Sequence, residues 1–181
     1  HASVFSEDLT FSSSGYSAVI NTPMGTMEVS GNLLGRFNIS NVLAVIATLI
    51  SLLSREGNGH IDLAKILNKV SSLDSVDGRM EIVNDVGEVA TIVDYAHTPE
   101  SLRCALESLK YHFKGNIWCV FGCGGNRDEG KRPIMGEIAE SLADHLVVTD
   151  DNPRTEVGDR IVSQILSGVR NPQNVSVVRD R

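Results

Sequence analysis

The sequence predicts an α/β protein whose C-terminal part is built on an open parallel sheet. From residue 79 onward, short apolar runs alternate with stretches of helical period. Two of these runs, Asn116–Phe121 and His145–Thr149, end in polar or glycine-rich segments. Strand–helix–strand repeats of this kind join parallel strands through right-handed crossovers. The chain stops soon after a further strand beginning at Val175, with no helix to follow it, so the predicted sheet is incomplete.

The first 35 residues read as strands and turns. Tyr16–Asn21 and Thr26–Ser30 alternate moderately between apolar and polar side chains, and the intervening Thr22-Pro23-Met24-Gly25 is typical of a hairpin loop. An antiparallel hairpin is therefore expected here.

Two helices should follow the hairpin. From Asn38 to Leu53 apolar residues occupy almost every side of the predicted helix, which favours a buried helix ended by Gly57-Asn58-Gly59. Asp62–Val70 is amphipathic and begins with a capping residue. The polar segment Ser71–Gly78 predicts a domain boundary, which divides the chain into residues 1–78 and 79–181.

The second domain opens with two strands, Met80–Asn84 and Val89–Asp94, joined by a turn at Asp85–Gly87. A helix should begin at Pro99, because Thr98 can cap it and proline suits the first helical position. The predicted helices are Pro99–Phe113, Pro133–Ala143 and Val157–Val169.

Composition excludes several classes of protein. The 181 residues carry a net charge of -7, which is unlike the basic surface of a general nucleic-acid binder. No apolar run is expected to reach the length of a membrane span, because Thr48 and Ser51 interrupt the longest one. The cysteine count of three is odd, and Cys119 lies in an apolar strand as a small core residue. A reducing, cytoplasmic location fits this pattern.

The segment Asp150-Asp151-Asn152-Pro153-Arg154 directly follows a predicted buried strand. Ligands bind at the carboxyl ends of the strands of an open parallel sheet. Arg154 offers a planar fork to a carboxylate and the acids offer partners to an ammonium, so the segment suits a zwitterion such as an amino acid. The alternative is a simple turn, since Asp, Asn and Pro are all turn formers.

A glycine-rich loop, Phe121–Asp128, also lies between a strand and a helix. It nearly fits the dinucleotide and phosphate-loop patterns. However, Arg127 replaces the third glycine of the first, and Arg132 replaces the Ser or Thr of the second. We therefore expect the glycines to let the backbone approach a ligand, and Arg127, Lys131 or Arg132 to face an anion. A glycine turn with solvated charges is the alternative.

Asp94 ends an apolar strand, so it should project at the same sheet edge as Asp151 and Arg127. His97, three residues later, could contact phosphate or ribose, although a histidine near a helix start is more often a polar neighbour of the cap. The sequence favours Asp94 over His97 for a chemical role.

Asn38 and Asn41 are three residues apart and so share a helix face, where side-chain amides suit the edge of a nucleobase. The pattern alone favours capping by Asn38 or Ser40 instead. Arg79 sits at the predicted boundary, where it could reach a phosphate or form a structural ion pair.

These motifs, in this order, resemble those of the Mur ligase family of ATP-dependent amide-bond-forming enzymes. The segment Gly35–Asn41 is similar to the end of the family's central ATPase domain. The segments that resemble its Rossmann-like C-terminal domain are Gly78–Glu81, Asp94–Pro99, the glycine loop with Arg127, and Asp151–Arg154.

The resemblance implies roles for individual residues. ATP would be bound by Asn38 and Asn41 beside the adenine, Arg79 at the phosphate, Asp94 at the ribose, and His97 with a less defined role, with Arg79 and Asp94 at the reaction centre. The incoming amino acid would be held by Arg127, Asp151, Asn152 and Arg154. In this family the Asp-Asn-Pro-Arg form is associated with meso-diaminopimelate, whose second carboxylate matches the fork of Arg154.

The implied reaction adds that amino acid to UDP-N-acetylmuramoyl-L-alanyl-D-glutamate through an acyl phosphate, in a cytoplasmic monomer that requires Mg²⁺. The family's phosphate loop, its magnesium ligands, its UDP-binding domain and its C-terminal Gly-His-Glu-type segment have no match in these residues. We therefore expect this chain alone to be inactive. The alternatives are a ligase similar to folylpolyglutamate synthetase and a non-catalytic nucleotide- or amino-acid-binding module.

Overall fold

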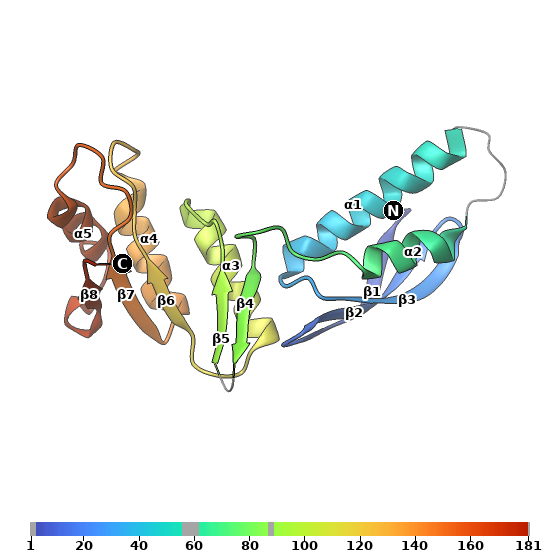
Figure 1. Cartoon of the computed structure of the whole chain (residues 1–181), viewed down its shortest axis with the longest axis horizontal. Coiled ribbons are helices and arrows are strands. Elements are labelled where there is room, and N and C mark those ends of the chain that lie inside the picture. Colours follow the sequence, from blue (N-terminus) through green and yellow to red (C-terminus); the bar gives the residue numbers. More distant parts are fainter. Residues whose placement is uncertain (1–2, 56–61, 87–88, 181) are drawn as a thin grey trace. The chain divides into compact units, whose positions relative to one another are not determined.

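The computed structural model describes residues 3–55, 62–86 and 89–180, which form two compact units (Figure 1). Unit 1 comprises residues 1–95 and 111–113, and unit 2 comprises residues 96–110 and 114–181. Each unit has its own hydrophobic core.

Unit 1 begins with a three-stranded antiparallel sheet in the order β1 (Phe5–Ser12), β2 (Gly15–Thr22) and β3 (Gly25–Gly31). Thr22 pairs with Gly25 across the β2–β3 turn, so the predicted hairpin is confirmed. Alternate side chains of β2, including Ala18 and Ile20, enter the core because successive residues of a strand face opposite sides of the sheet.

Two helices follow, α1 (Arg36–Arg55) and α2 (Leu63–Ser71). The prediction for α2 is confirmed, and the Asp62 side chain caps it by accepting a hydrogen bond from the Lys65 N–H at 3.1 Å. The predicted helix end at residues 57–59 lies outside the described residues.

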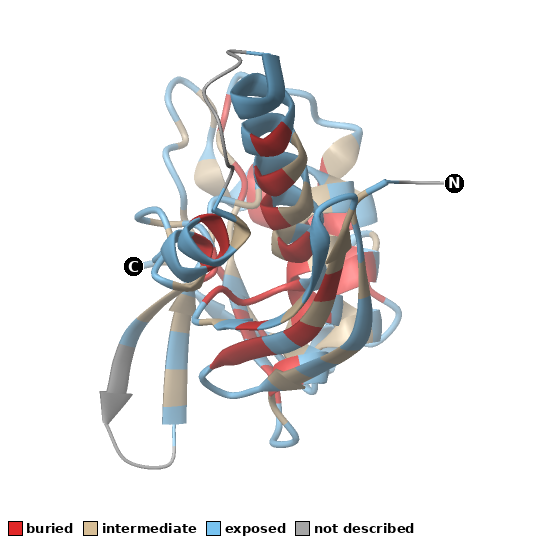
Figure 2. Cartoon of the chain, turned by 90° about the vertical axis from the view of Figure 1, so that its right-hand side faces the viewer, coloured by how far each residue is buried: buried red, intermediate tan, exposed pale blue. Residues whose placement is uncertain are grey.

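The prediction that α1 is buried on all sides was wrong. Figure 2 shows the buried positions along one side of the helix. The core of unit 1 receives Ile39, Val42, Ile46 and Ile50, whereas Val45, Leu49, Leu52 and Leu53 are exposed. The apolar composition is therefore shared between a face packed against the sheet and α2 and a face that the described residues leave uncovered. By length and composition alone this 20-residue helix is apolar enough to span a membrane, contrary to the expectation from the interrupted run, but core helices of soluble proteins meet the same criterion.

Unit 1 also contains β4 (Glu81–Val86) and β5 (Val89–Val93), which pair with each other in a separate antiparallel sheet. β4 continues through Asp85, where a turn was predicted, and Gly87 lies outside the described residues.

Unit 2 contains the predicted parallel sheet, in the order β6 (Trp118–Phe121), β7 (His145–Thr149) and β8 (Ser176–Val178). The parallel register aligns Trp118 with His145 and Val148 with Val177. The helices are α3 (Pro99–His112, whose last two residues belong to unit 1), α4 (Lys131–Leu142) and α5 (Gly158–Leu166), and the 3-10 turn Pro172–Asn174 precedes β8. The α/β fold with a parallel sheet is thus confirmed.

The core of unit 2 is formed where α4 and α5 cover one face of this sheet. Cys119, Leu146 and Val148 point from the strands into this core, against Met135 of α4 and Ile165 of α5. Cys119 is a core residue as predicted, and burial raises the pKa of its thiol to about 12. β6 and β7 are neighbours, and the chain therefore leaves both strands at the same edge of the sheet.

Candidate functional site

Two loops leave this edge of unit 2 and carry the predicted amino-acid-binding residues. The glycine loop, residues 122–130, follows β6 and contains Arg127. The DNPR loop, residues 150–157, follows β7 and contains Asp151, Asn152 and Arg154. The structure brings these two loops into direct contact.

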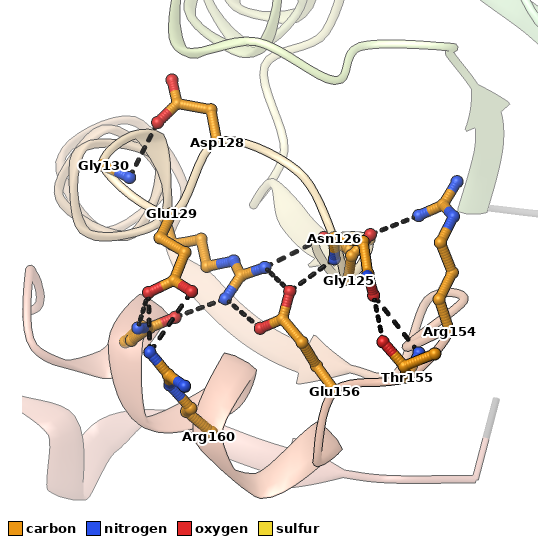
Figure 3. Close-up of polar contacts among 12 residues, drawn as sticks. Gly125, Asn126, Asp128, Glu129, Gly130, Arg154, Thr155, Glu156 and Arg160 are labelled. Atoms are coloured by element: carbon orange, nitrogen blue, oxygen red, sulfur yellow. Dashed lines mark hydrogen bonds and ion pairs between the residues drawn. The ribbon is translucent and has the colours of Figure 1, made fainter.

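Hydrogen bonds join the loops along their length (Figure 3). The Gly125 N–H donates to the Asn152 carbonyl at 2.9 Å, and the Arg154 guanidinium donates to the Gly125 carbonyl at 2.6 Å. The Asn126 side-chain oxygen accepts from the Thr155 N–H at 3.2 Å and from its hydroxyl at 3.0 Å. The central residues of one loop are therefore fixed relative to those of the other.

The glycines of this loop serve loop–loop packing. A Cβ at Gly125 would lie 1.9 Å from the Pro153 carbonyl oxygen, and one at Gly122 would lie 2.3 Å from that of Thr149, at the end of β7, and 3.0 Å from the Asp151 nitrogen. These glycines therefore let the backbone approach the DNPR loop, and their approach to a ligand stays a prediction.

Of the three cations expected to face an anion, Arg132 is not available to a ligand. This side chain is fully buried and forms a two-pronged ion pair with Glu156, at 2.9 Å from one guanidinium nitrogen and 3.0 Å from the other. It also donates to the Gly124 carbonyl at 3.2 Å and to the Gln164 side-chain oxygen. The physical reason is that Arg132 lies in the first turn of α4 on its inward side, where only a paired charge is tolerated.

Glu156 connects the ion pair to the glycine loop, because its carboxylate also accepts a hydrogen bond from the Asn126 N–H. The hydrogen bonds from Arg132 and then from Asn126 lower the pKa of Glu156 to about 2. The carboxylate is therefore ionised throughout the physiological range.

Some of the other charged side chains near the two loops already have partners within the fold, and others are exposed. Asp150 accepts a two-pronged pair from Arg179 at 2.7 and 2.9 Å, so its carboxylate is committed within the fold. Lys131 donates to the His97 carbonyl at 2.6 Å. Arg127 and Arg154 are exposed, and Arg154 has a left-handed backbone with φ of 51° that directs its guanidinium over the glycine loop.

Asn38 and Asn41 lie at the start of α1 in unit 1. The Asn41 amide nitrogen donates to the Asn38 side-chain oxygen at 3.2 Å, so the two side chains share a face as expected. The Asn38 amide nitrogen donates to the Leu34 carbonyl at 2.7 Å and therefore fixes the turn before the helix instead of capping a helix N–H. Asn41 is exposed, and its side-chain oxygen and second N–H point to no partner in residues 3–55.

Arg79 and Asp94 are close together in unit 1. The Asp94 carboxylate accepts a hydrogen bond from the buried Met80 N–H at 2.9 Å, which anchors a turn in which Gly78 and Met80 have left-handed backbones. The exposed Arg79 side chain lies over the Tyr95 ring with its guanidinium carbon 4.6 Å from the centroid. Among the described residues Arg79 makes this cation–π contact in place of the ion pair considered as its alternative role.

The expectation that Asp94 projects from the same sheet edge as Asp151 was wrong. Asp94 follows β5, and β5 pairs with β4 in the antiparallel sheet of unit 1, because a short turn makes that local pairing available. Asp151 belongs to the parallel sheet of unit 2. His97 lies in unit 2, and its backbone carbonyl is the acceptor for Lys131.

Sequence reasoning missed Glu156 and His112. His112 is buried; its Nε2 accepts the Gly35 N–H at 2.9 Å, so Nδ1 carries the proton and donates to the Ser12 carbonyl at 2.7 Å. The histidine thus holds the turn that precedes Asn38. Neither residue belongs to a recognisable motif, and each is identified only by its contacts with segments distant in the chain.

Comparisons with known proteins agree with this architecture. Residues 78–181 match the family described as Mur ligase, glutamate ligase domain. The UDP-N-acetylmuramoyl-L-alanyl-D-glutamate–2,6-diaminopimelate ligase of Pseudomonas putida is 44% identical over 180 residues, which are 99% of this chain and 35% of that protein.

Two solved structures show the same fold. A UDP-N-acetylmuramoyl-L-alanyl-D-glutamate–2,6-diaminopimelate ligase superposes with a TM-score of 0.68 and 35% identity, covering 99% of this chain and 36% of that one. Folylpolyglutamate synthase of Mycobacterium tuberculosis superposes with a TM-score of 0.74 at 17% identity, covering 98% and 38%, and this likeness shows the fold alone. This chain spans about a third of the length of these relatives. With the family match extending over more than half of its residues, the chain belongs to the Mur ligase family.

Proposed function

We propose that this chain is part of an ATP-dependent ligase that joins meso-diaminopimelate to UDP-N-acetylmuramoyl-L-alanyl-D-glutamate in peptidoglycan precursor synthesis. The observation that carries the proposal is the pair of hydrogen-bonded loops in unit 2, which presents Arg127 and Arg154 from neighbouring strands. The Pseudomonas putida relative, named for the same two substrates, supports this choice within the family.

In the proposed site, Arg127, Asp151, Asn152 and Arg154 bind the incoming amino acid. Diaminopimelate carries a second carboxylate at the end where lysine carries only an ammonium. A guanidinium can hold that carboxylate through two parallel hydrogen bonds, whereas it would repel a lone ammonium. Arg154 would therefore discriminate between the two amino acids.

Unit 1 would bind ATP. The exposed amide of Asn41 supplies one donor and one acceptor, which fits the edge of an adenine, and Asn38 fixes its orientation. Arg79 is exposed and held over Tyr95, so its guanidinium is available to a phosphate, while Asp94 fixes the Arg79 turn and would approach the ribose. We assign residues 1–78 to the end of the central ATP-binding domain and residues 79–181 to the amino-acid-binding domain.

The proposed reaction has two chemical steps. The γ-phosphoryl group of ATP passes to the D-glutamyl carboxylate to give an acyl phosphate and ADP. The neutral amine of diaminopimelate then attacks the carbonyl carbon, and the tetrahedral intermediate loses phosphate and a proton from nitrogen to give the amide. Both steps depend mainly on positioning and on cationic stabilisation of developing charge. Arg79 would stabilise the phosphate charge, and Arg127 and Arg154 would orient the amine.

Mg²⁺ would neutralise phosphate charge in such a reaction. The described residues contain no cluster of three or more acidic, His or Cys side chains able to hold a metal. We therefore assign its ligands to other parts of the full-length protein, which we propose to be a cytoplasmic monomer.

The test is phosphate release by the full-length protein with ATP, Mg²⁺ and the UDP-linked dipeptide, comparing diaminopimelate, lysine and glutamate as acceptors. We expect turnover with diaminopimelate only and none from the 181-residue chain alone. Preference for glutamate would support a folylpolyglutamate-type ligase, and binding without turnover would support a non-catalytic module. Activity of the isolated chain would contradict the assignment of the phosphate-binding machinery to other residues.

A further inference from the structure

An ion pair joins the fully buried Arg132 to Glu156, a residue of the DNPR loop whose side chain is 15% exposed. Four of the five N–H donors of Arg132 have partners, in the Glu156 carboxylate, the Gly124 carbonyl and the Gln164 side chain. The fifth, on Nε, is buried with no partner among the described residues. This is an expensive arrangement, because every unpaired buried donor costs free energy.

Stability alone is a weak reason for such a pair. Removing two charges from water offsets much of their attraction, and replacing a buried pair with apolar side chains of similar size is often neutral or stabilising. In some proteins a buried ionic group instead selects one arrangement of the groups around it. The groups to examine are therefore those that Arg132 and Glu156 contact.

Those groups lie on both sides of Gly125. Arg132 donates to the Gly124 carbonyl, and Glu156 accepts the N–H of Asn126, whose backbone is left-handed with φ of 53°. The ion pair therefore binds both peptide units that flank Gly125: Arg132 donates to the carbonyl of the first, and Glu156 accepts from the N–H of the second.

Both cations of the candidate site depend on this fixed segment. Arg154 donates to the Gly125 carbonyl at 2.6 Å, and Arg127 directly follows Asn126 in the chain. Glu156 itself is two residues from Arg154, so the same carboxylate restrains both loops. A shift of the ion pair would move both guanidinium groups relative to each other.

We propose that Arg132 and Glu156 are positioning residues for amino-acid selection: the pair sets the spacing of Arg127 and Arg154 and so determines which carboxylates the loops accept. The proposal rests on the proposed function. Neither residue contacts the amino acid in this scheme, because Arg132 is fully buried and the Glu156 carboxylate is engaged by Arg132 and by the Asn126 N–H.

Three variants of the full-length protein test it. Glu156→Gln keeps the shape of the side chain and removes the charge. Arg132→Met with Glu156→Leu replaces the whole pair with apolar groups. Glu137→Gln is the matched control. Glu137 lies on α4, as Arg132 does, but it forms an exposed ion pair with Arg170 at 4.0 Å.

We expect Glu156→Gln to raise the KM for diaminopimelate roughly 10- to 100-fold, as small misplacements of binding groups do, and to leave the KM for ATP within about twofold. The double variant should melt at least as high as Glu156→Gln and keep the defect in diaminopimelate binding and in preference over lysine. The control should match the wild type.

Restoration of the wild-type KM by the apolar double variant would show that the pair is only structural and overturn the inference. If Glu156→Gln raised the KM for ATP as much as the KM for diaminopimelate, the inference would also be overturned. A wild-type protein that does not ligate diaminopimelate would instead refute the proposed function, and the inference with it.

Discussion

Replacement of Gly125 by alanine should separate the glycine loop from the DNPR loop. The added Cβ would lie 1.9 Å from the Pro153 carbonyl oxygen and 2.6 Å from its carbonyl carbon, and both are backbone atoms that no side-chain rotation can move. To reach an ordinary contact of 3.4 Å, the backbones must part by about 1.5 Å, the difference between 3.4 and 1.9 Å.

A separation of that size exceeds what the adjoining hydrogen bonds tolerate. The bond from the Gly125 N–H to Asn152 is 2.9 Å long and that from Arg154 to the Gly125 carbonyl is 2.6 Å long, so both would be broken. A neutral hydrogen bond contributes about 1 kcal/mol and one to a charged donor roughly 1.5–3 kcal/mol. Because Arg154 is exposed, water weakens its hydrogen bond, and we use the lower part of that range for it. We therefore expect a loss of roughly 2–3 kcal/mol in the free energy of unfolding of unit 2.

The measurement is urea unfolding of the 181-residue chain followed by tryptophan fluorescence. The only tryptophan, Trp118, belongs to unit 2 and stacks on His145 with a centroid distance of 4.2 Å, so its emission reports that unit. Gly115→Ala is the control, because a Cβ there meets nothing within 4 Å. If Gly125→Ala and Gly115→Ala unfold within about 0.5 kcal/mol of each other, the steric argument is refuted.

Three further predictions concern the same framework. Because the folded-state pKa of Glu156 is lowered to about 2, its contribution to stability is complete above about pH 4.5 and is lost as the pH falls toward 2, so Glu156→Gln should flatten the acid limb of a melting-temperature profile. Asp62→Ala removes the N-cap of α2 and should cost about 1 kcal/mol by circular dichroism in urea, with Asp74→Ala, outside any helix, as the comparison. Asp94→Ala leaves the buried Met80 N–H without its acceptor, so amide exchange at Met80 should accelerate, whereas no change there would show that another group holds this turn.

The sequence was sufficient to predict which loops meet in unit 2. Their meeting follows from topology, because consecutive strands linked by helices run parallel and release their loops at one edge. The same reasoning failed for Asp94, since an apolar run ended by an acid looks alike whether its strand joins a parallel sheet or a local hairpin. Pattern identifies the strand, but the choice of pairing partner depends on competition among distant segments.

The cationic residues of the glycine loop show a second limit. Arg127, Lys131 and Arg132 carry equal charge in the sequence, and helical geometry decides that Arg132 faces the interior. Its partner Glu156 lies 24 residues further along the chain, so no local spacing predicts the pair. A buried arginine such as Arg132 is identified only from a structure, which shows the acceptors that surround it.

The loops themselves explain why the fold needs both tight glycines and a buried ion pair. Hydrogen bonds between backbone and polar side chains join the loops. Close contact, which Gly122 and Gly125 permit, and the hydrogen bonds of Arg132 and Glu156 add to their rigidity. The proposed selection by the position of one carboxylate would require guanidinium groups held with that kind of rigidity, because a mobile loop would accept both diaminopimelate and lysine.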